Sequence, residues 1–195
     1  MTPAPVASRG LAALHVAAAT AGLTVFSSAS WPETDADREV PALAGFIESD
    51  FSPLLAEVAG RALSRRALGG LEQRPASGTV TAVVMVTALG DVSTATRVAA
   101  AVDAGERVSP LLFFQSVPNA VAGYLAARWQ LTGPVVCISG ITAGLDVAAL
   151  LIADADADEA LVVRVDLPLS GGTDSAAAVL VTGPATRSDC GPREL

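Results

Sequence analysis

Histidine and cysteine are considered first as catalytic residues, because acid–base chemistry near neutral pH and thiolate attack depend on them. The 195-residue chain contains one histidine, His15, and two cysteines, Cys137 and Cys190. His15 lies in an apolar run that we interpret as a strand, where a hydrogen-bonded structural role is expected. A Ser-His-Asp or Cys-His unit would depend on this single imidazole. The spacing of the cysteines predicts neither a disulfide framework nor a metal site.

Phosphate and metal sites are also not predicted. No G-x-G-x-x-G follows the first strand, and a chain without lysine cannot contain a P-loop. The acidic run at 154–159 lacks the glycine and the terminal bidentate ligand of a calcium loop, so we interpret it as a solvated loop. The formal net charge of −8 opposes binding to nucleic acid. We therefore expect no cofactor, no metal and no nucleic-acid partner.

One concentration of basic residues stands out in this acidic chain. Arg61 and Arg65 are four residues apart and share one face of a predicted helix, with Arg66 beside them. Such a face is suited to an acidic carrier protein or to a carboxylate at an interface. The alternative interpretation is an ordinary solvated helix face.

Strands and helices alternate along the chain. The patterns predict strands at 11–17, 79–87, 135–139, 161–167 and 176–182, and helices at 53–69, 91–104, 118–131 and 142–153. The first helix is expected to begin at an N-cap Ser52 and to end at Gly69-Gly70. A long irregular loop with Trp31 as its anchor is expected between the first strand and that helix.

This alternation predicts an α/β fold with a mixed, mostly parallel five-stranded sheet and helices on its faces. The last two strands have no helix between them, which allows an antiparallel edge. We expect one domain over residues 1–184, followed by a flexible tail at 185–195. No apolar run reaches the roughly 20 residues that a membrane span needs, so we expect a cytoplasmic protein that does not enter a membrane.

Residues 109–145, SPLLFFQSVPNAVAGYLAARWQLTGPVVCISGITAGL, carry the most specific motif. In order they give Ser-Pro, an aromatic pair, Ser-Val-Pro-Asn, a small-residue helix, Gly-Pro, a buried strand and Gly-Leu within the next helix. This stretch resembles the amino-terminal half of the β-ketoacyl synthases, which have the thiolase fold. It more closely resembles a short ketosynthase-like branch that begins with a Trp-containing loop and an Arg-rich first helix. Trp31 and the three arginines are compatible with that branch.

The resemblance implies that the nucleophile of the family is missing. Active ketosynthases carry a cysteine at a strand-to-helix junction, where helix N–H groups stabilise the thiolate. Matching backwards from Gly144-Leu145 places Ile141 at that position, and matching forwards from Gly133-Pro134 places Thr142 there. Cys137 lies too early and is expected to be a small buried strand residue. The paired histidines of ketosynthases belong to a second half that this chain does not contain.

The resemblance therefore implies a non-catalytic partner subunit that pairs with a catalytic ketosynthase, or with itself, in polyketide or fatty-acid biosynthesis. Such a subunit would set acyl-chain length or initiation, with an acyl carrier protein as a further partner. The acyl-tunnel or interface candidates are Phe113, Phe114, Gln115, Pro118 and Asn119. Two alternatives remain open. One is an acyl-transfer or malonyl-decarboxylating enzyme that uses Thr142 or Ser139, and the other is a homodimeric carrier-protein or lipid-binding module.

Overall fold

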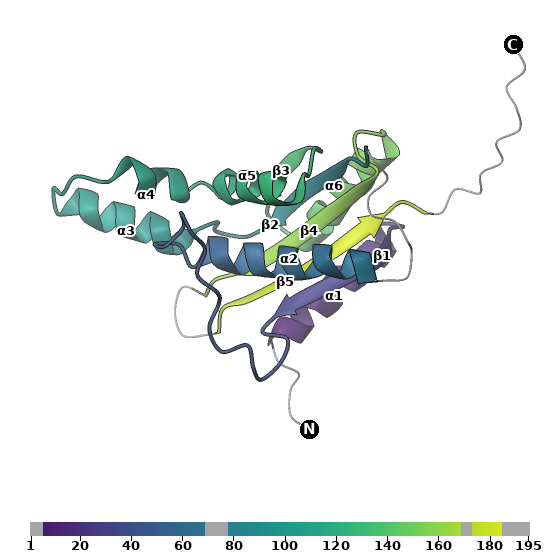
Figure 1. The fold of residues 1–195 in the computed structure, drawn as a ribbon, viewed down its shortest axis with the longest axis horizontal. Coiled ribbons are helices and arrows are strands. Elements are labelled where there is room, and N and C mark those ends of the chain that lie inside the picture. The colour runs from purple at the N-terminus through teal and green to yellow at the C-terminus, as the bar shows by residue number, and fades with distance from the viewer. Residues whose placement is uncertain (1–5, 69–77, 169–172, 185–195) are drawn as a thin grey trace, which may run out of the picture.

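The computed structural model describes residues 6–68, 78–168 and 173–184, which form a sheet covered by helices on both faces (Figure 1). The strands are β1 (Thr24–Trp31), β2 (Thr81–Val86), β3 (Val135–Ile138), β4 (Glu159–Asp166) and β5 (Ser175–Thr182). The helices are α1 (Val6–Thr20), α2 (Phe51–Leu68), α3 (Val92–Asp103), α4 (Pro110–Gln115), α5 (Pro118–Trp129) and α6 (Ile141–Ala153). The predicted tail at 185–195 and the predicted helix end at Gly69-Gly70 lie outside the described residues.

The five strands form one sheet in the order β1-β5-β4-β2-β3. β2 pairs in parallel with both β3 and β4, whereas β5 is antiparallel to β4 and β1. Four strands therefore run in one direction and β5 alone runs in the other. This confirms the predicted mixed, mostly parallel sheet, although β5 lies inside it and β1 forms the edge.

The two faces of the sheet bury alternate residues of the same strands. Val83, Met85 and Leu161 pack against α2 and α5, while Val84 and Val162 pack against α1 and α6. β2, β4 and β5 are buried almost throughout, because helices cover both their faces. The prediction of helices on both faces is confirmed.

The first predicted strand is wrong, because residues 11–17 belong to helix α1. Leu11, Leu14 and Ala18 recur at three- and four-residue spacing and face the core, which is the period of a helix. His15 is consequently exposed on a helix and is not a strand residue. The first strand instead occupies 24–31, at the start of the stretch predicted to be a loop, with Trp31 buried at its end.

Helices α3 and α4 form an arm, residues 92–115, that lies beyond one end of the sheet (Figure 1). Side-chain caps begin both helices, because the Asp91 carboxylate accepts from the Thr94 N–H and the Ser109 hydroxyl accepts from the Leu111 N–H. Thr94 is the only buried residue of α3 and Gln115 the only one of α4. The arm is therefore attached with little hydrophobic burial.

Strand β3 is at the opposite edge of the sheet from β1, and its predicted burial is wrong. Val135 and Cys137 are exposed, since β3 pairs with β2 on one side and with no other strand of the described chain. The predicted N-cap of α2 at Ser52 is also wrong. The side chain that caps this helix is Ser49, whose hydroxyl accepts a hydrogen bond from the Ser52 N–H. None of the helices in the described ranges is long and apolar enough to cross a membrane.

Candidate functional site

The junction between β3 and α6 holds the position at which the resemblance places a nucleophile. The chain turns at Gly140, whose φ of 93° is in the left-handed region that favours glycine, and α6 begins at Ile141. Gly144 then brings α6 close to the sheet, because a Cβ there would lie 2.5 Å from the Val86 side chain. Ile141 and Thr142 thus occupy the first turn of the helix.

The two first-turn residues differ in exposure and in chemistry. Ile141 is partly buried and packs on the core, while Thr142 is exposed. A shallow apolar depression beside them is lined by Ala12, Ala13, Val16, Ala17, Thr20, Ile141 and Thr142. None of these lining residues is titratable, so the Thr142 hydroxyl faces no base within the depression. Ser139, the other candidate hydroxyl, is exposed at the end of β3.

Cys137 lies outside the β3–α6 junction. It lies on β3, where its side chain is exposed at the edge of the sheet, so the prediction of a buried strand residue is wrong. Partial desolvation raises the pKa of its thiol. A raised pKa lowers the thiolate fraction at neutral pH, whereas a reactive cysteine needs a lowered one. The described residues also contain no group of three or more His, Cys, Asp or Glu side chains that could hold a metal ion.

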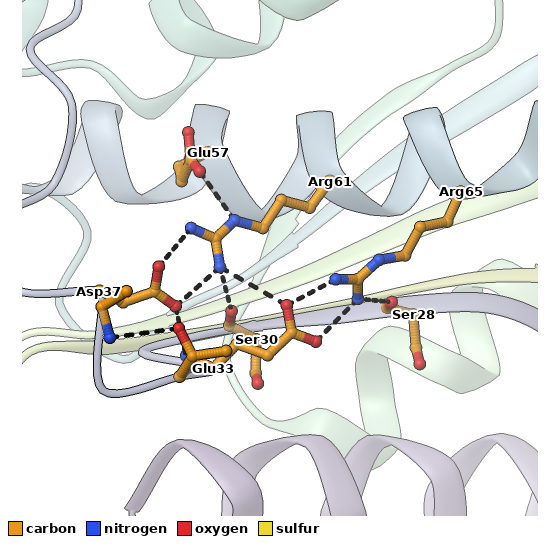
Figure 2. Close-up of polar contacts among 9 residues, drawn as sticks. Ser28, Ser30, Glu33, Asp37, Glu57, Arg61 and Arg65 are labelled. Carbon is orange, nitrogen blue, oxygen red and sulfur yellow. Dashed lines mark hydrogen bonds and ion pairs between the residues drawn. The ribbon is translucent and has the colours of Figure 1, made fainter.

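Arg61 is held inside a network of carboxylates between α2 and the loop after β1 (Figure 2). Its Nη atoms donate to both Asp37 carboxylate oxygens at 2.9 and 2.8 Å, and its Nε donates to Glu57 at 2.7 Å. Its guanidinium lies 4.7 Å from the ring centroid of Trp31. Arg61 holds the pKa of the Asp37 carboxyl well below its usual range.

The two neighbouring arginines are also paired within the chain. Arg65 donates to both Glu33 carboxylate oxygens at 2.8 and 2.6 Å and to the Ser28 carbonyl at 2.7 Å (Figure 2). This pairing lowers the pKa of Glu33. Arg66 donates to the buried Glu159 at 2.6 Å. The three guanidinium groups therefore join α2 to the sheet and to the loop after β1, and their role in docking a carrier protein stays a prediction.

A second region, along α4, α5 and β3, has the opposite character. Of the exposed large apolar residues in the described chain, most lie in or beside this stretch, and we name them the apolar edge: Leu89, Val102, Leu111, Phe113, Phe114, Val117, Tyr124 and Val135. Phe113 is 64% exposed and Phe114 is 58% exposed. Exposed large apolar side chains mark a site of interaction on a soluble protein where they form a contiguous patch.

The other three predicted tunnel residues differ from the two phenylalanines in how exposed they are. Gln115 is buried, and its amide Nε2 donates to the Gly45 carbonyl, so its side chain does not contribute to an exposed surface. Pro118 is the first residue of α5 and is partly buried, while Asn119 is exposed. Three of the five candidates, Phe113, Phe114 and Asn119, are thus exposed, and their role in a tunnel or interface stays a prediction.

Sequence reasoning missed the acidic partners of the arginines and the exposed position of β3. The partners Glu33 and Asp37 lie in the predicted loop, where charge alone does not reveal pairing across 24 to 32 residues. A possible signal was the four-residue spacing of Glu57 and Arg61, which is suited to an ion pair on one helix.

Comparison with known proteins supplies a family match. A family model for the β-ketoacyl synthase amino-terminal domain matches residues 59–179. No curated protein sequence matches the chain.

Solved structures with a similar fold include two described as ketosynthase and chain length factor. One is the ketosynthase ApeO in complex with its chain length factor ApeC from Xenorhabdus doucetiae, with 17% identity, coverage of 83% of this chain and 79% of that chain, and a TM-score of 0.63. Another is the ishigamide ketosynthase/chain length factor, with 20% identity, coverage of 80% and 50%, and a TM-score of 0.61.

A β-ketoacyl synthase from Burkholderia phymatum STM815 is also similar, with 16% identity, coverage of 86% and 54%, and a TM-score of 0.54. This chain therefore spans about half the length of the ishigamide and Burkholderia chains. These likenesses establish a shared thiolase-like fold, as the sequence motif predicts.

Proposed function

The chain belongs to the β-ketoacyl synthase amino-terminal domain family, and from that premise we propose that it is a non-catalytic partner subunit of a catalytic ketosynthase. In this role it acts in polyketide or fatty-acid biosynthesis and shapes the length or initiation of the acyl chain. The observation that carries the proposal is the β3–α6 junction, where α6 begins at Ile141 and the described residues that line the neighbouring depression include neither a thiol nor a titratable side chain.

The chemistry of the β3–α6 junction supports a non-catalytic role. Condensation through an acyl-enzyme needs a nucleophile activated by a lowered pKa or by an adjacent base. Ile141 has no nucleophilic atom, and a threonine hydroxyl without a base is a weak nucleophile at neutral pH. The N–H groups of the α6 first turn could stabilise an oxyanion, but they cannot supply the missing nucleophile.

The apolar edge supports association with a partner. Strand β3 leaves one side without a strand neighbour in the described chain, and unpaired edges with exposed apolar residues favour pairing with another chain. On α5, Gly123 has no atom within 4 Å of where a Cβ would lie, so the backbone of a partner can approach closely there. We propose that the apolar edge contacts the catalytic ketosynthase, with a second copy of this chain as the competing occupant.

Within this interface we assign the tunnel role to Phe113 and Phe114. Both rings are more than half exposed on the arm, which carries them beyond the end of the sheet (Figure 1). Large aromatic side chains on a partner surface are able to close one end of an acyl cavity in the opposing subunit. Pro118 and Asn119 lie at the start of α5, four to six residues after the aromatic pair, and we assign them to the same interface.

We propose that an acyl carrier protein docks mainly on the catalytic partner. The formal net charge of this chain is −8, and the arginines predicted to dock a carrier protein are paired with carboxylates. An acidic carrier protein would meet repulsion here. We also propose a reducing cytoplasm as the compartment, since Cys137 is a free thiol.

Co-expression with a full-length catalytic ketosynthase, taken first from any encoded beside this chain, tests the proposal. We expect the two chains to co-purify and to elute together from a sizing column at a mass that contains both. A chain that remains alone, or that forms only a complex with itself, would contradict the ketosynthase partnership. The latter result would favour the homodimeric module.

A further inference from the structure

Gln115 is buried at the end of α4, and only one of its two polar amide atoms forms a hydrogen bond. Its Nε2 donates to the Gly45 carbonyl, whereas its Oε1 has no hydrogen-bond partner. Because a carbonyl can be met only by the nitrogen of the amide, this contact fixes the orientation of the side chain. Buried polar atoms almost always have a partner. An apolar residue at this position would remove the unpaired oxygen but would also remove the donor to the Gly45 carbonyl.

The loop that Gln115 contacts also holds α3. The Thr94 hydroxyl donates to the Glu48 carbonyl at 3.2 Å, and the Asp50 N–H donates to the Ser93 hydroxyl at 3.3 Å. Arg97 forms an ion pair with the Glu48 side chain. Both helices of the arm are thus fastened to residues 45–50 by polar contacts. Since the arm buries only one residue from each helix, these contacts determine where the arm lies.

Gln115 also determines which way the aromatic pair faces. Successive residues of an α-helix are separated by about 100° around its axis. With Gln115 turned inward toward Gly45, its two preceding neighbours, Phe113 and Phe114, are left on the exposed side of α4. A change in this one contact would therefore rotate or loosen both rings together.

We propose that Gln115 is a positioning residue that fixes the arm against the 45–50 loop and so sets how far Phe113 and Phe114 extend into the partner subunit. The length of acyl chain that the pair of subunits accommodates then depends on this contact, although Gln115 itself never meets the acyl chain. This inference rests on the partner role proposed above.

The first test uses the isolated chain and hydrogen exchange of its backbone amides. Gln115→Met keeps a side chain of similar size but removes the donor to Gly45. We expect residues 110–117 to exchange about fivefold faster than in the wild type, as loss of one net hydrogen bond implies. Val58→Ala on α2 is the control, because it removes buried volume far from the arm and should lower the unfolding temperature without local acceleration. Unchanged exchange at 110–117 in Gln115→Met would overturn the positioning role.

The second test uses the complex with the co-expressed ketosynthase, supplied with malonyl- and acyl-carrier protein. We expect Gln115→Met to leave the yield of complex within about twofold of the wild type, since the surface residues are unchanged. The chain lengths of the carrier-bound products should shift by at least one extension step. A normal complex with unchanged products would overturn this inference and leave the partner role standing. Absence of any wild-type complex would overturn the partner role, and the exchange measurement would still decide whether Gln115 positions the arm.

Discussion

Two regions of the molecule differ in how many of their side chains have partners within the chain. One is the side where α2 meets β1, and the other is the apolar edge along α4, α5 and β3. At the first, Arg61 and Arg65 donate to carboxylates and to strand carbonyls of the same chain (Figure 2). At the second, Phe113 and Phe114 are exposed and β3 has an open side. The first region therefore pairs its arginines within the chain, whereas the second leaves large apolar side chains exposed.

The largest effect is expected at the apolar edge. Phe113→Ser combined with Phe114→Ser should weaken binding to the ketosynthase partner by about 1000-fold, because two aromatic anchors at an interface contribute about 2 kcal/mol each. The dissociation constant is measured by surface plasmon resonance, with the purified ketosynthase immobilised and each purified variant of this chain in solution. Leu150→Ser is the control, since Leu150 on α6 is 58% exposed, like Phe114, but lies outside the edge and outside the loop that contacts the arm. Equal affinity of the double variant and the control would remove the edge as the interface.

A smaller effect, on stability, is expected at the arginine network. Arg61→Ala should lower the free energy of unfolding by about 2 to 3 kcal/mol, because it leaves Asp37 and Glu57 without their cation and removes the contact with Trp31. Urea titration measures the change. Arg128→Ala, an exposed arginine on α5, should change stability by less than about 0.5 kcal/mol. Similar losses in both variants would show that the network has no special role.

Substitutions of two helical glycines, one packed on the sheet and one on the open side of α5, should change stability in opposite directions. Gly144→Ala places a Cβ 2.5 Å from the Val86 side chain, so overpacking should lower stability by about 2 kcal/mol. Gly123→Ala has open space around it and should raise stability by about 0.5 to 1 kcal/mol, since alanine favours the helix. Thermal unfolding of the isolated chain distinguishes the two. If Gly123→Ala instead lowers the stability, the space around Gly123 on α5 is already filled in the isolated chain.

The smallest expected effect is the dependence of stability on pH at the network. The folded pKa values of Glu33 and Asp37 lie below their ordinary values, so the unfolded chain takes up protons first as the pH falls. Their stabilisation is therefore complete at pH 7 and is lost as the pH falls from about 5 toward the lower folded values. Urea titrations from pH 7 to pH 3 should show this decline. Glu33→Gln with Asp37→Asn should show a flatter decline, and an identical slope would contradict the assignment.

Residues with regular patterns were predictable from the sequence. The buried runs gave β2, β4 and β5, and the motif at 109–145 gave the family and the junction without a cysteine. The wrong strand at 11–17 arose because alanine-rich apolar runs fit a buried strand as well as a helix, and only the three- and four-residue spacing favoured the helix.

Other features depend on contacts that local sequence does not encode. The exposure of Cys137 follows from the edge position of β3, which is set by sheet order and not by the apolar run itself. The pairing of Arg65 with Glu33 joins residues 32 positions apart. The burial of Gln115 depends on a loop residue 70 positions away. Each of these requires the folded arrangement of separate elements.

Intact-mass analysis of the co-purified complex tests the central proposal most directly. The complex is incubated with malonyl- and acyl-carrier protein, and the mass of each chain is then measured. The account predicts an acyl adduct on the ketosynthase and an unmodified mass for this chain, together with condensation products. An adduct on this chain that Thr142→Ala or Ser139→Ala removes would contradict the non-catalytic role and would favour the acyl-transfer alternative.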